Sequence, residues 1–305
     1  DLNKIWKEIQ HTFLILKDWH EDHEFYHKIG YLITSNTKSL QDIFALSKRK
    51  IDGRGITKKE FKSELDMYIK ESIDLSKIDY KNSFELSYKN DRESKFIWKL
   101  LLLFNVESVR KNGEQTQWFP FEKFKFNGKG KDPWSLEHIH AQLSKGMQNQ
   151  KDWKEWLSLH LTSIKTLGDG NDDLREEMEK ALGKERLERI EFEEIQRKVI
   201  DKLSAHDNSE YVHSIANLAL LNMSDNTALS NSTFDVKRNR IIEMDKKGQF
   251  IPFCTKMVFL KYYTPSESNQ LHFWGEPDRK AYIDAINDKL KHYLGDVISI
   301  EMEAE

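Results

Sequence analysis

The sequence predicts a mainly α-helical protein with one small α+β part near its middle. Apolar residues recur at helical spacing through residues 1–110, 150–205 and 277–294. Between Trp118 and Lys131 the pattern changes, because phenylalanines there alternate with charged residues and glycines. The 305 residues allow one large domain or two ordinary ones, and a hydrophobic content of 38% is enough for a packed core.

Charge and cysteine content narrow the class of protein. The 48 lysines and arginines nearly balance the 51 aspartates and glutamates, so any contact with nucleic acid must come from a local basic patch. The single cysteine, Cys254, excludes an internal disulfide framework and a cysteine zinc site, and it fits a reducing cytoplasm. The sequence shows no secretory signal pattern and no apolar run of bilayer length, so we expect a cytoplasmic protein without a membrane segment.

Residues 1–110 are predicted to form a helical linker or scaffold domain. Two apolar stripes near the start indicate two helices. Thr57, with Glu60 three residues later, is typical of a capping box and predicts a third helix. The run from Trp98 to Phe104 is apolar nearly all round, which predicts a buried central helix.

Residues 111–305 are predicted to form a second domain around an antiparallel hairpin. A short strand or extended segment would lie near 118–126 and the second strand at 134–139, with a loop rich in glycine and lysine between them. Residues from about 149–205 are expected to be a helical insertion. A helix that is capped by Ser232 and begins near it would then pack on the hairpin, and further helices would complete the domain.

Two segments far apart in the sequence carry a set of chemically complementary residues. Glu137 and His138 stand side by side in the predicted second strand, Asn217 opens the run Asn-Leu-Ala-Leu-Leu, and Asn226 follows nine positions later. Imidazole titrates near neutral pH, so His138 is the candidate general base that takes a proton from water. Such a base must be held in one orientation, and the side-chain carbonyl of Asn217 is the candidate partner of its other ring nitrogen.

The same set contains candidate ligands for a metal ion and for phosphate. Glu137 and Asn226 offer hard oxygen ligands, which suit magnesium or manganese. Lys237 and Arg238 lie on the helix predicted to pack on the hairpin, and they are candidates for phosphate contact. His140, two residues beyond the candidate base, would either contact substrate or be a hydrogen-bonded bystander. Together these groups supply what the hydrolysis of a phosphodiester requires.

Each residue also has a structural interpretation that the sequence leaves open. Asn217 would then cap an apolar turn, Asn226 would be a turn residue, and Lys237 and Arg238 would be solvated charges. His213, four residues before Asn217, is predicted to be structural. A basic patch precedes the motif, and it would either contact a nucleic-acid backbone or line a solvated edge. Its members are Lys123, Lys125, Lys129 and Lys131.

The segment from Trp134 to Gln142 resembles the Glu-His-Ile-x-Pro-Gln motif of the GmrSD-type HNH (His-Me finger) nuclease domain. That domain is the C-terminal part of GmrSD-like, modification-dependent Type IV restriction endonucleases. Residues 214–221 resemble its Gly-Asn-Leu-x-Leu-Leu segment, and the resemblance covers about residues 95–290. Departures occur at Ala141 and Ala216, where the family has proline and glycine. Further matching residues follow in the family's order: Asn226, Leu229, Ser230, Asn231, Phe234, Lys237, Arg238, Thr255, Phe259, Trp274 and Tyr282.

The resemblance implies a small ββα-metal core in a mainly α fold, with His138 as the base of an HNH-type endonuclease and Mg²⁺ or Mn²⁺ as its cofactor. It also implies a role in restriction of phage or modified foreign DNA, with double-stranded DNA as the substrate. The family's N-terminal nucleotide-dependent domain, with its Asp-Gly-Gln-Gln-Arg motif, is not in this sequence. We therefore expect that domain or subunit as a partner, and we expect the chain to be a piece of a longer protein.

Two other functions stay open at this point. HNH chemistry does not itself require DNA, so the same residues would also suit a nuclease that cuts RNA. The chain would otherwise be a helical module that binds nucleic acid or the missing domain without cutting. The complete set of Glu137, His138, Asn217 and Asn226 argues against a degenerate, non-catalytic site.

Overall fold

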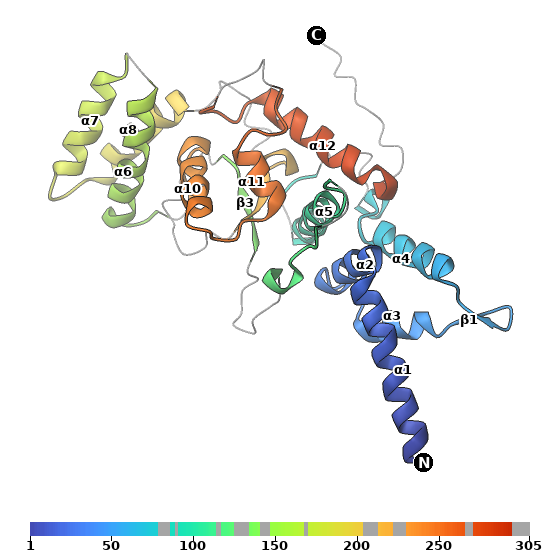
Figure 1. The fold of residues 1–305 in the computed structure, drawn as a ribbon. Coiled ribbons are helices and arrows are strands. Elements are labelled where there is room, and N and C mark those ends of the chain that lie inside the picture. The colour runs from blue at the N-terminus through green and yellow to red at the C-terminus, as the bar shows by residue number, and fades with distance from the viewer. Residues whose placement is uncertain are drawn as a thin grey trace, which may run out of the picture. The chain divides into compact units, whose positions relative to one another are not determined.

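The computed structural model describes residues 1–78, 86–88, 91–113, 117–124, 134–140, 147–167, 170–203, 213–221, 230–265 and 271–294. Within them the protein is mostly helical, as the sequence predicts (Figure 1). None of the described helices is long and apolar enough to cross a membrane.

The chain divides into two compact units. Unit 1 comprises Asp1–Asn82, Lys95–Pro133 and Asn287–Glu305, and unit 2 comprises Ser83–Ser94 and Trp134–Ile286. The division passes through two helices, α5 and α12, whose first residues are counted with unit 2. The predicted boundary near residue 110 falls inside unit 1, and the independent folding of the two predicted domains stays a prediction.

Unit 1 is built on helices, and α2 packs against both α1 and α4. The capping box predicted for α4 is confirmed, because Thr57 Oγ1 accepts a hydrogen bond from the N–H of Glu60 and the Glu60 carboxylate accepts one from the N–H of Thr57. Helix α5 buries most of the residues from Phe96 to Val109, as its apolar sequence predicts. The helices are α1 Leu2–Glu21, α2 His23–Thr34, α3 Leu40–Ser47, α4 Lys58–Ser72, α5 Asp91–Arg110 and, at its C-terminal end, α12 Glu276–Leu294.

Three small elements complete the described part of unit 1. They are a two-residue hairpin of β1 (Lys50–Ile51) and β2 (Arg54–Gly55), the 3-10 turn η1 (Leu75–Ile78) and the 3-10 turn η3 (Phe121–Phe124). For the described residues, the predicted strand near 118–126 is wrong, because η3 stands in its place. Phe119 and Phe124 are both buried, with ring centroids 5.0 Å apart. These phenylalanines therefore turn inward together instead of alternating between two faces of a strand.

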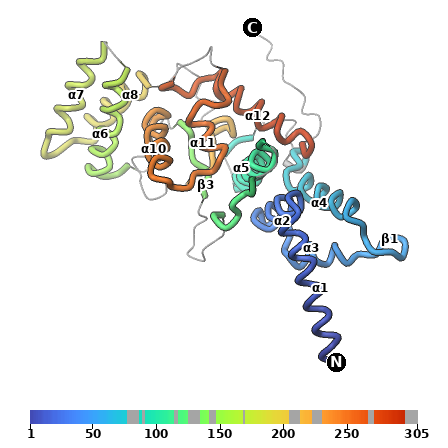
Figure 2. The backbone as a smooth tube through the Cα atoms, viewed as in Figure 1, coloured from blue at the N-terminus to red at the C-terminus, as the bar shows by residue number. Residues whose placement is uncertain are grey.

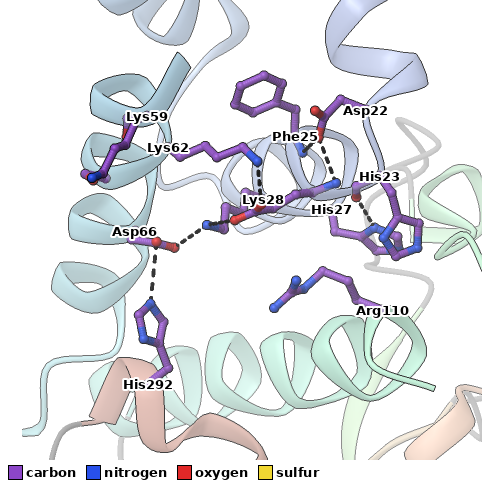
Figure 3. A network of polar contacts seen from close by, with 12 residues as sticks. Asp22, His23, Phe25, His27, Lys28, Lys59, Lys62, Asp66, Arg110 and His292 are labelled. Atoms are coloured by element: carbon purple, nitrogen blue, oxygen red, sulfur yellow. Dashed lines mark hydrogen bonds and ion pairs between the residues drawn. The ribbon is translucent and has the colours of Figure 1, made fainter. Parts of the chain in front are cut away.

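A buried lysine of α2, Lys28, forms ion pairs with a carboxylate of α2 and a carboxylate of α4 (Figure 3). Lys28 is 4% exposed, and its Nζ lies 2.5 Å from Glu24 Oε1 and 2.8 Å from Asp66 Oδ1. Lys62 approaches the other carboxylate oxygen of Glu24 at 2.6 Å. Burial alone would raise the pKa of Glu24, but the hydrogen bonds from Lys28 and Lys62 lower that pKa to about 2. The two ammonium groups of Lys28 and Lys62 are therefore paired with the two carboxylates of Glu24 and Asp66.

Unit 2 contains a helical part with a hydrophobic core of its own, which confirms the helix predicted between residues 150 and 205. Its helices α6 (Gln150–Thr166), α7 (Asp172–Gly183) and α8 (Arg189–Leu203) pack against one another (Figure 1). Trp156 and Phe192 are among its buried residues, and their rings meet edge to face at 5.7 Å.

The rest of unit 2 surrounds a two-stranded antiparallel ribbon. Strand β3 (Ser135–His138) pairs with β4 (Leu218–Leu221), which follows the 3-10 turn η5 (Ile215–Asn217). The predicted strand at 134–139 is confirmed, but its partner is β4 and not the segment near 118–126. All four residues of β4 are buried, whereas all four residues of β3 are half-buried. Helices α10 (Phe234–Lys246) and α11 (Phe253–Phe259) follow in the chain (Figure 2).

Side chains from later in the sequence close the edge of β4 that faces away from β3. They donate to alternate carbonyl groups of this segment: Trp274 Nε1 to Ala216 at 3.0 Å, Tyr282 Oη to Leu218 at 3.2 Å, and Thr255 Oγ1 to Leu220 at 2.7 Å. A strand edge that is buried must have its carbonyl groups satisfied, and here side chains take the place of a third strand.

Candidate functional site

Strand β3 presents Glu137 and His138 at a position fixed by β4. His138 lies opposite Leu218 in the ribbon, and the N–H of the next residue, Ile139, donates to the carbonyl of Asn217 at 2.8 Å. Both candidate site residues are half-buried, while their neighbour Ile139 is fully buried. The ribbon therefore holds the backbone of the candidate base firmly and leaves part of its side chain at the surface.

Asn217 clamps the backbone just beyond the candidate base. Its Oδ1 accepts a hydrogen bond from the N–H of His140 at 3.0 Å, and its Nδ2 donates to the carbonyl of His140 at 2.9 Å. The side chain is 4% exposed, so these bonds are shielded from water. The structure thus gives Asn217 the task of fixing the end of β3, and direct binding of the His138 ring stays a prediction.

Two buried histidines accept hydrogen bonds from backbone N–H groups at the N-terminus of α10. His140 Nδ1 accepts a hydrogen bond from the N–H of Phe234 at 3.2 Å, and His160 Nε2 accepts one from the N–H of Thr233 at 3.2 Å. The predicted cap, Ser232, is wrong by one residue, since Thr233 is the N-cap and its own side chain makes no capping bond. The two imidazoles therefore supply acceptors that a capping side chain normally supplies.

Burial keeps both of these histidines neutral. It lowers the pKa of His140 to about 3, and it lowers the pKa of His160 to about 3 although the hydrogen bond to the Trp156 carbonyl raises it. His140 was a candidate for substrate contact, and the structure places it 6% exposed in the interior with a capping task. His160 was not predicted, because a histidine in a helix of mixed composition gives no sequence signal for a cap on another helix.

Lys237 and Arg238, the two candidate phosphate contacts, occupy different environments. Lys237 has no exposed surface, and its Nζ donates to the carbonyl of His138 at 2.5 Å. Burial lowers the pKa of Lys237 to about 8, although the nearby carboxylate of Glu137 raises it. Arg238 is half-buried, and within the described residues its Nε makes no hydrogen bond. That Nε is itself buried, and Arg238 differs from Lys237 in keeping part of its side chain exposed.

Glu137 is the described candidate for a metal ligand. Burial raises the pKa of Glu137, while Lys237 and a hydrogen bond from Ser135 Oγ at 3.4 Å lower it. The second candidate ligand, Asn226, lies outside the described residues. Among those that are described, no group of three histidine, cysteine, aspartate or glutamate side chains is placed to hold a metal ion.

Two further rings contact His138. The Tyr88 ring centroid lies 5.8 Å away at an interplanar angle of 76°, and the His213 ring centroid lies 5.6 Å away at 63°. The sequence indicated a structural role for His213, and it gave no reason to single out Tyr88. A tyrosine fifty residues before the motif is recognised as a neighbour only when the fold brings it there.

The basic patch before the motif is only partly visible. Lys123 is exposed on η3 in unit 1. Lys125, Lys129 and Lys131 lie outside the described residues, so their contact with a nucleic-acid backbone stays a prediction.

Residues 193–277 match the family model described as GmrSD restriction endonucleases, C-terminal domain. A search of curated proteins and a search of solved structures each gave no significant match. The matched segment contains η5, β4, α10 and α11, and it ends where α12 begins. Strand β3 lies outside the match and is bound to it by the contacts described above. Residues 193–277 are thus similar to the C-terminal domain of GmrSD restriction endonucleases, which confirms the resemblance predicted from the sequence over this segment.

Proposed function

We propose that this chain contains a metal-dependent DNA endonuclease site of the HNH type, with His138 as general base and β3, β4 and α10 as its ββα core. One observation carries the proposal. The segment related to GmrSD restriction endonucleases holds the backbone around His138 by three separate contacts: the pairing of β4 with β3, the amide of Asn217 on His140, and Lys237 on the carbonyl of His138.

The proposed reaction is hydrolysis of a phosphodiester. A ring nitrogen of His138 takes a proton from a water molecule, and the water oxygen forms a bond to phosphorus as the bond from phosphorus to the leaving sugar oxygen breaks. The leaving oxygen takes a proton from solvent, so atoms and charge balance. A positioned general base contributes on the order of 10²–10⁴ in rate.

The oxygen ligands of the site fit Mg²⁺ or Mn²⁺. Glu137 offers a half-buried carboxylate next to the base in sequence, and its hydrogen bond from Ser135 Oγ is long, at 3.4 Å. Asn226, outside the described residues, is the second proposed ligand. A bound ion would stabilise the charge that develops on the leaving oxygen.

The remaining residues divide into a substrate contact and positioning groups. Arg238 is the proposed phosphate contact, because its cationic side chain on α10 keeps part of its surface exposed, whereas Lys237 does not. Asn217 and Lys237 are proposed to position the base through its backbone. His140 is proposed to position α10 rather than to bind phosphate, because it is buried and bonded to Phe234.

The family description supports the biological part of the proposal. We propose that the substrate is double-stranded DNA of phage or modified foreign origin, that cutting takes place in the cytoplasm, and that a nucleotide-dependent N-terminal domain or subunit controls it. The support is that the matched family consists of restriction endonucleases and that the matched region is their C-terminal domain.

Incubation with plasmid DNA and with single-stranded RNA, each with magnesium, manganese or EDTA, tests the proposal. We expect nicked or linear plasmid with either metal and intact plasmid with EDTA. His138→Ala should lower the cleavage rate by on the order of 10²–10⁴ and leave the melting temperature and DNA binding unchanged. The matched control is His11→Ala on the exposed side of α1, which should cut like the wild type.

The outcomes separate the competing functions. Cleavage of RNA with intact plasmid would assign the site to RNA instead. Binding of DNA without cleavage of either nucleic acid would identify a helical binding module. A His138→Ala variant within a few-fold of wild type would show that another group is the base.

A further inference from the structure

His138 lies against two aromatic rings that have no part in the proposed chemistry. The contacts with Tyr88 and His213 have centroid distances of 5.8 and 5.6 Å and interplanar angles of 76° and 63°. Rings at these distances and angles meet edge to face, which is the favoured geometry for aromatic neighbours. All three residues belong to unit 2, so the cluster lies within one compact body.

Tyr88 and His213 are held together by their backbones. The N–H of Tyr88 donates to the carbonyl of His213 at 2.7 Å, and the N–H of Ile215 donates to the carbonyl of Leu86 at 2.9 Å. Between these two bonds lies an antiparallel bridge that pairs residues 87 and 214. Residues opposite each other in such a bridge place their side chains next to each other, so Tyr88 and His213 form a cross-strand pair.

A short stretch of backbone connects this pair to the strand that carries His138. Ser214 Oγ accepts a hydrogen bond from the N–H of Ala216 at 3.2 Å and so begins η5. Asn217 then clamps the backbone of β3, and Leu218 lies opposite His138 in the ribbon. Residues 213–218 therefore connect His213 to the ribbon position opposite His138 through described backbone contacts.

The fold does not explain why residue 213 is a histidine. Its Nδ1 is buried and makes no hydrogen bond within the described part of the chain. A buried polar atom without a partner costs stability, and an aliphatic side chain at this position would avoid that cost. Residues that break a local rule in this way are concentrated at functional sites.

We propose that Tyr88 and His213 are positioning residues of the site and hold the imidazole of His138 in a single orientation. The catalytic role of this ring orientation rests on the proposed function. The orientation of the ring itself does not depend on that function. Tyr88 lies upstream of the segment that matches the family model, so a residue outside that segment completes the surroundings of the base.

Kinetics of the full chain give the first test, with His213→Leu and Tyr88→Leu as variants. We expect kcat for plasmid cleavage to fall by on the order of 10- to 100-fold with KM unchanged, because a misplaced base slows the chemical step and not substrate binding. Tyr88→Phe, which keeps the ring, should restore most of the activity that Tyr88→Leu loses. The free energy of unfolding of His213→Leu should be equal to or above that of the wild type.

Exposed residues of the same types provide matched controls. His11→Leu on α1 and Tyr262→Leu, whose side chain is 73% exposed, should leave kcat unchanged. A loss of kcat in these controls equal to the loss in the site variants would overturn the proposal, because the effect would then not depend on contact with His138.

Nuclear magnetic resonance of the histidine rings gives a test that does not depend on activity. The signals of His138 are assigned by their disappearance in His138→Gln. We expect one sharp set in the wild type, and a broadened or second set in His213→Leu and Tyr88→Leu. Such a result with a wild type that cuts no nucleic acid would refute the proposed function and support the positioning. One sharp set in every variant, with an active wild type and unchanged kcat, would refute the positioning and leave the proposed function intact.

Discussion

Two buried lysines show how differently the two units use charge. Lys28 in unit 1 is 4% exposed, and its ammonium group lies against the carboxylates of Glu24 and Asp66 (Figure 3). Lys237 in unit 2 has no exposed surface, and its ammonium group donates to a neutral carbonyl, that of His138. A buried charge is costly unless an opposite charge or several hydrogen bonds compensate it.

This difference suggests that Lys28 contributes to the stability of the fold and that Lys237 contributes to the candidate site. Lys28 joins two helices of unit 1 through matched ion pairs. Lys237 is less well compensated, because burial lowers its pKa to about 8 in spite of the nearby Glu137. Its one clear task is to hold the backbone of the proposed base. We therefore expect removal of Lys28 to affect stability and removal of Lys237 to affect catalysis.

The largest expected effect is the loss of stability in Lys28→Met. Glu24 and Asp66 lose their shared cation, and removing one partner of a buried ion pair costs about 3–5 kcal/mol, which we reduce to about 2–3 kcal/mol because both carboxylates keep some contact with water. Urea denaturation measures this change. Lys62→Met is the matched control: Lys62 is 33% exposed and also binds Glu24, so its removal should cost less than about 1 kcal/mol. An equal loss of unfolding free energy in both variants would show that the burial of Lys28 does not make its ion pairs more important than that of Lys62.

Lys237→Met should show the opposite pattern. We expect kcat for DNA cleavage to fall on the order of tenfold, because the carbonyl of His138 loses the group that fixes it. The free energy of unfolding should stay within about 1 kcal/mol of the wild type, since a buried charge and one hydrogen bond disappear together. Steady-state kinetics and urea denaturation on the same samples measure both. A large loss of stability with normal kcat would place Lys237 in the same class as Lys28.

The change of unfolding free energy above pH 8 tests whether Lys237 is buried as a poorly compensated charge. Its folded pKa of about 8 is below the ordinary value of 10.5, so the unfolded state binds more protons between these values. The free energy of unfolding should therefore rise as pH increases from about 8, and this contribution should be absent in Lys237→Met. Denaturation at pH 7.5 and 9 compares the two proteins below the range in which tyrosines ionise.

Acid should weaken both units. Burial lowers the pKa of His27 in unit 1 to about 4 and that of His160 in unit 2 to about 3, both from 6.5. The unfolded state therefore binds more protons below pH 6.5, and each histidine removes up to about 1.4 kcal/mol of stability per pH unit as the pH falls toward its folded pKa. His27→Gln and His160→Gln should each reduce the slope between pH 6.5 and 5, while the exposed control His11→Gln should not.

The smallest expected effect is on the salt dependence of DNA binding. Arg238→Ala should lower the slope of log affinity against log salt by about one unit, because one phosphate contact is lost. Lys237→Met should leave this slope unchanged, since Lys237 has no exposed surface. Arg189→Ala on α8, which removes an exposed arginine, is the control. An unchanged slope in Arg238→Ala would mean that the phosphate is held elsewhere.

Local patterns in the sequence predicted the helices well, because each pattern and its structural consequence lie within one segment. The capping box at Thr57 and the apolar run at Trp98–Phe104 are read from a few adjacent residues, and both correspond to helices in the structure. The strand at 134–139 was also predicted locally. Its partner was not, since the run Leu218–Leu221 is apolar at every position, and such a run does not distinguish a buried strand from a buried turn or helix.

The candidate site shows the same limit. Asn217 was predicted to orient the ring of His138, whereas the structure shows its amide group bound to the backbone of His140. Lys237 was predicted to contact phosphate, or otherwise to be a solvated charge, because a lysine on a polar helix is normally exposed. The contacts of Tyr88 with His138 and of His160 with Thr233 join residues 50 and 73 positions apart, and only the folded chain shows them.

The closed edge of β4 has a consequence for how the protein is made. The donors that satisfy its carbonyl groups come from residues 35, 58 and 64 positions later in the chain. During synthesis from the N-terminus, β4 leaves the ribosome well before Trp274 and Tyr282 do. Until those side chains arrive, the nascent ribbon presents an apolar strand with an open edge, which is the kind of surface that pairs with other chains. Trp274 and Tyr282 are thus also what protects β4 from pairing with other chains.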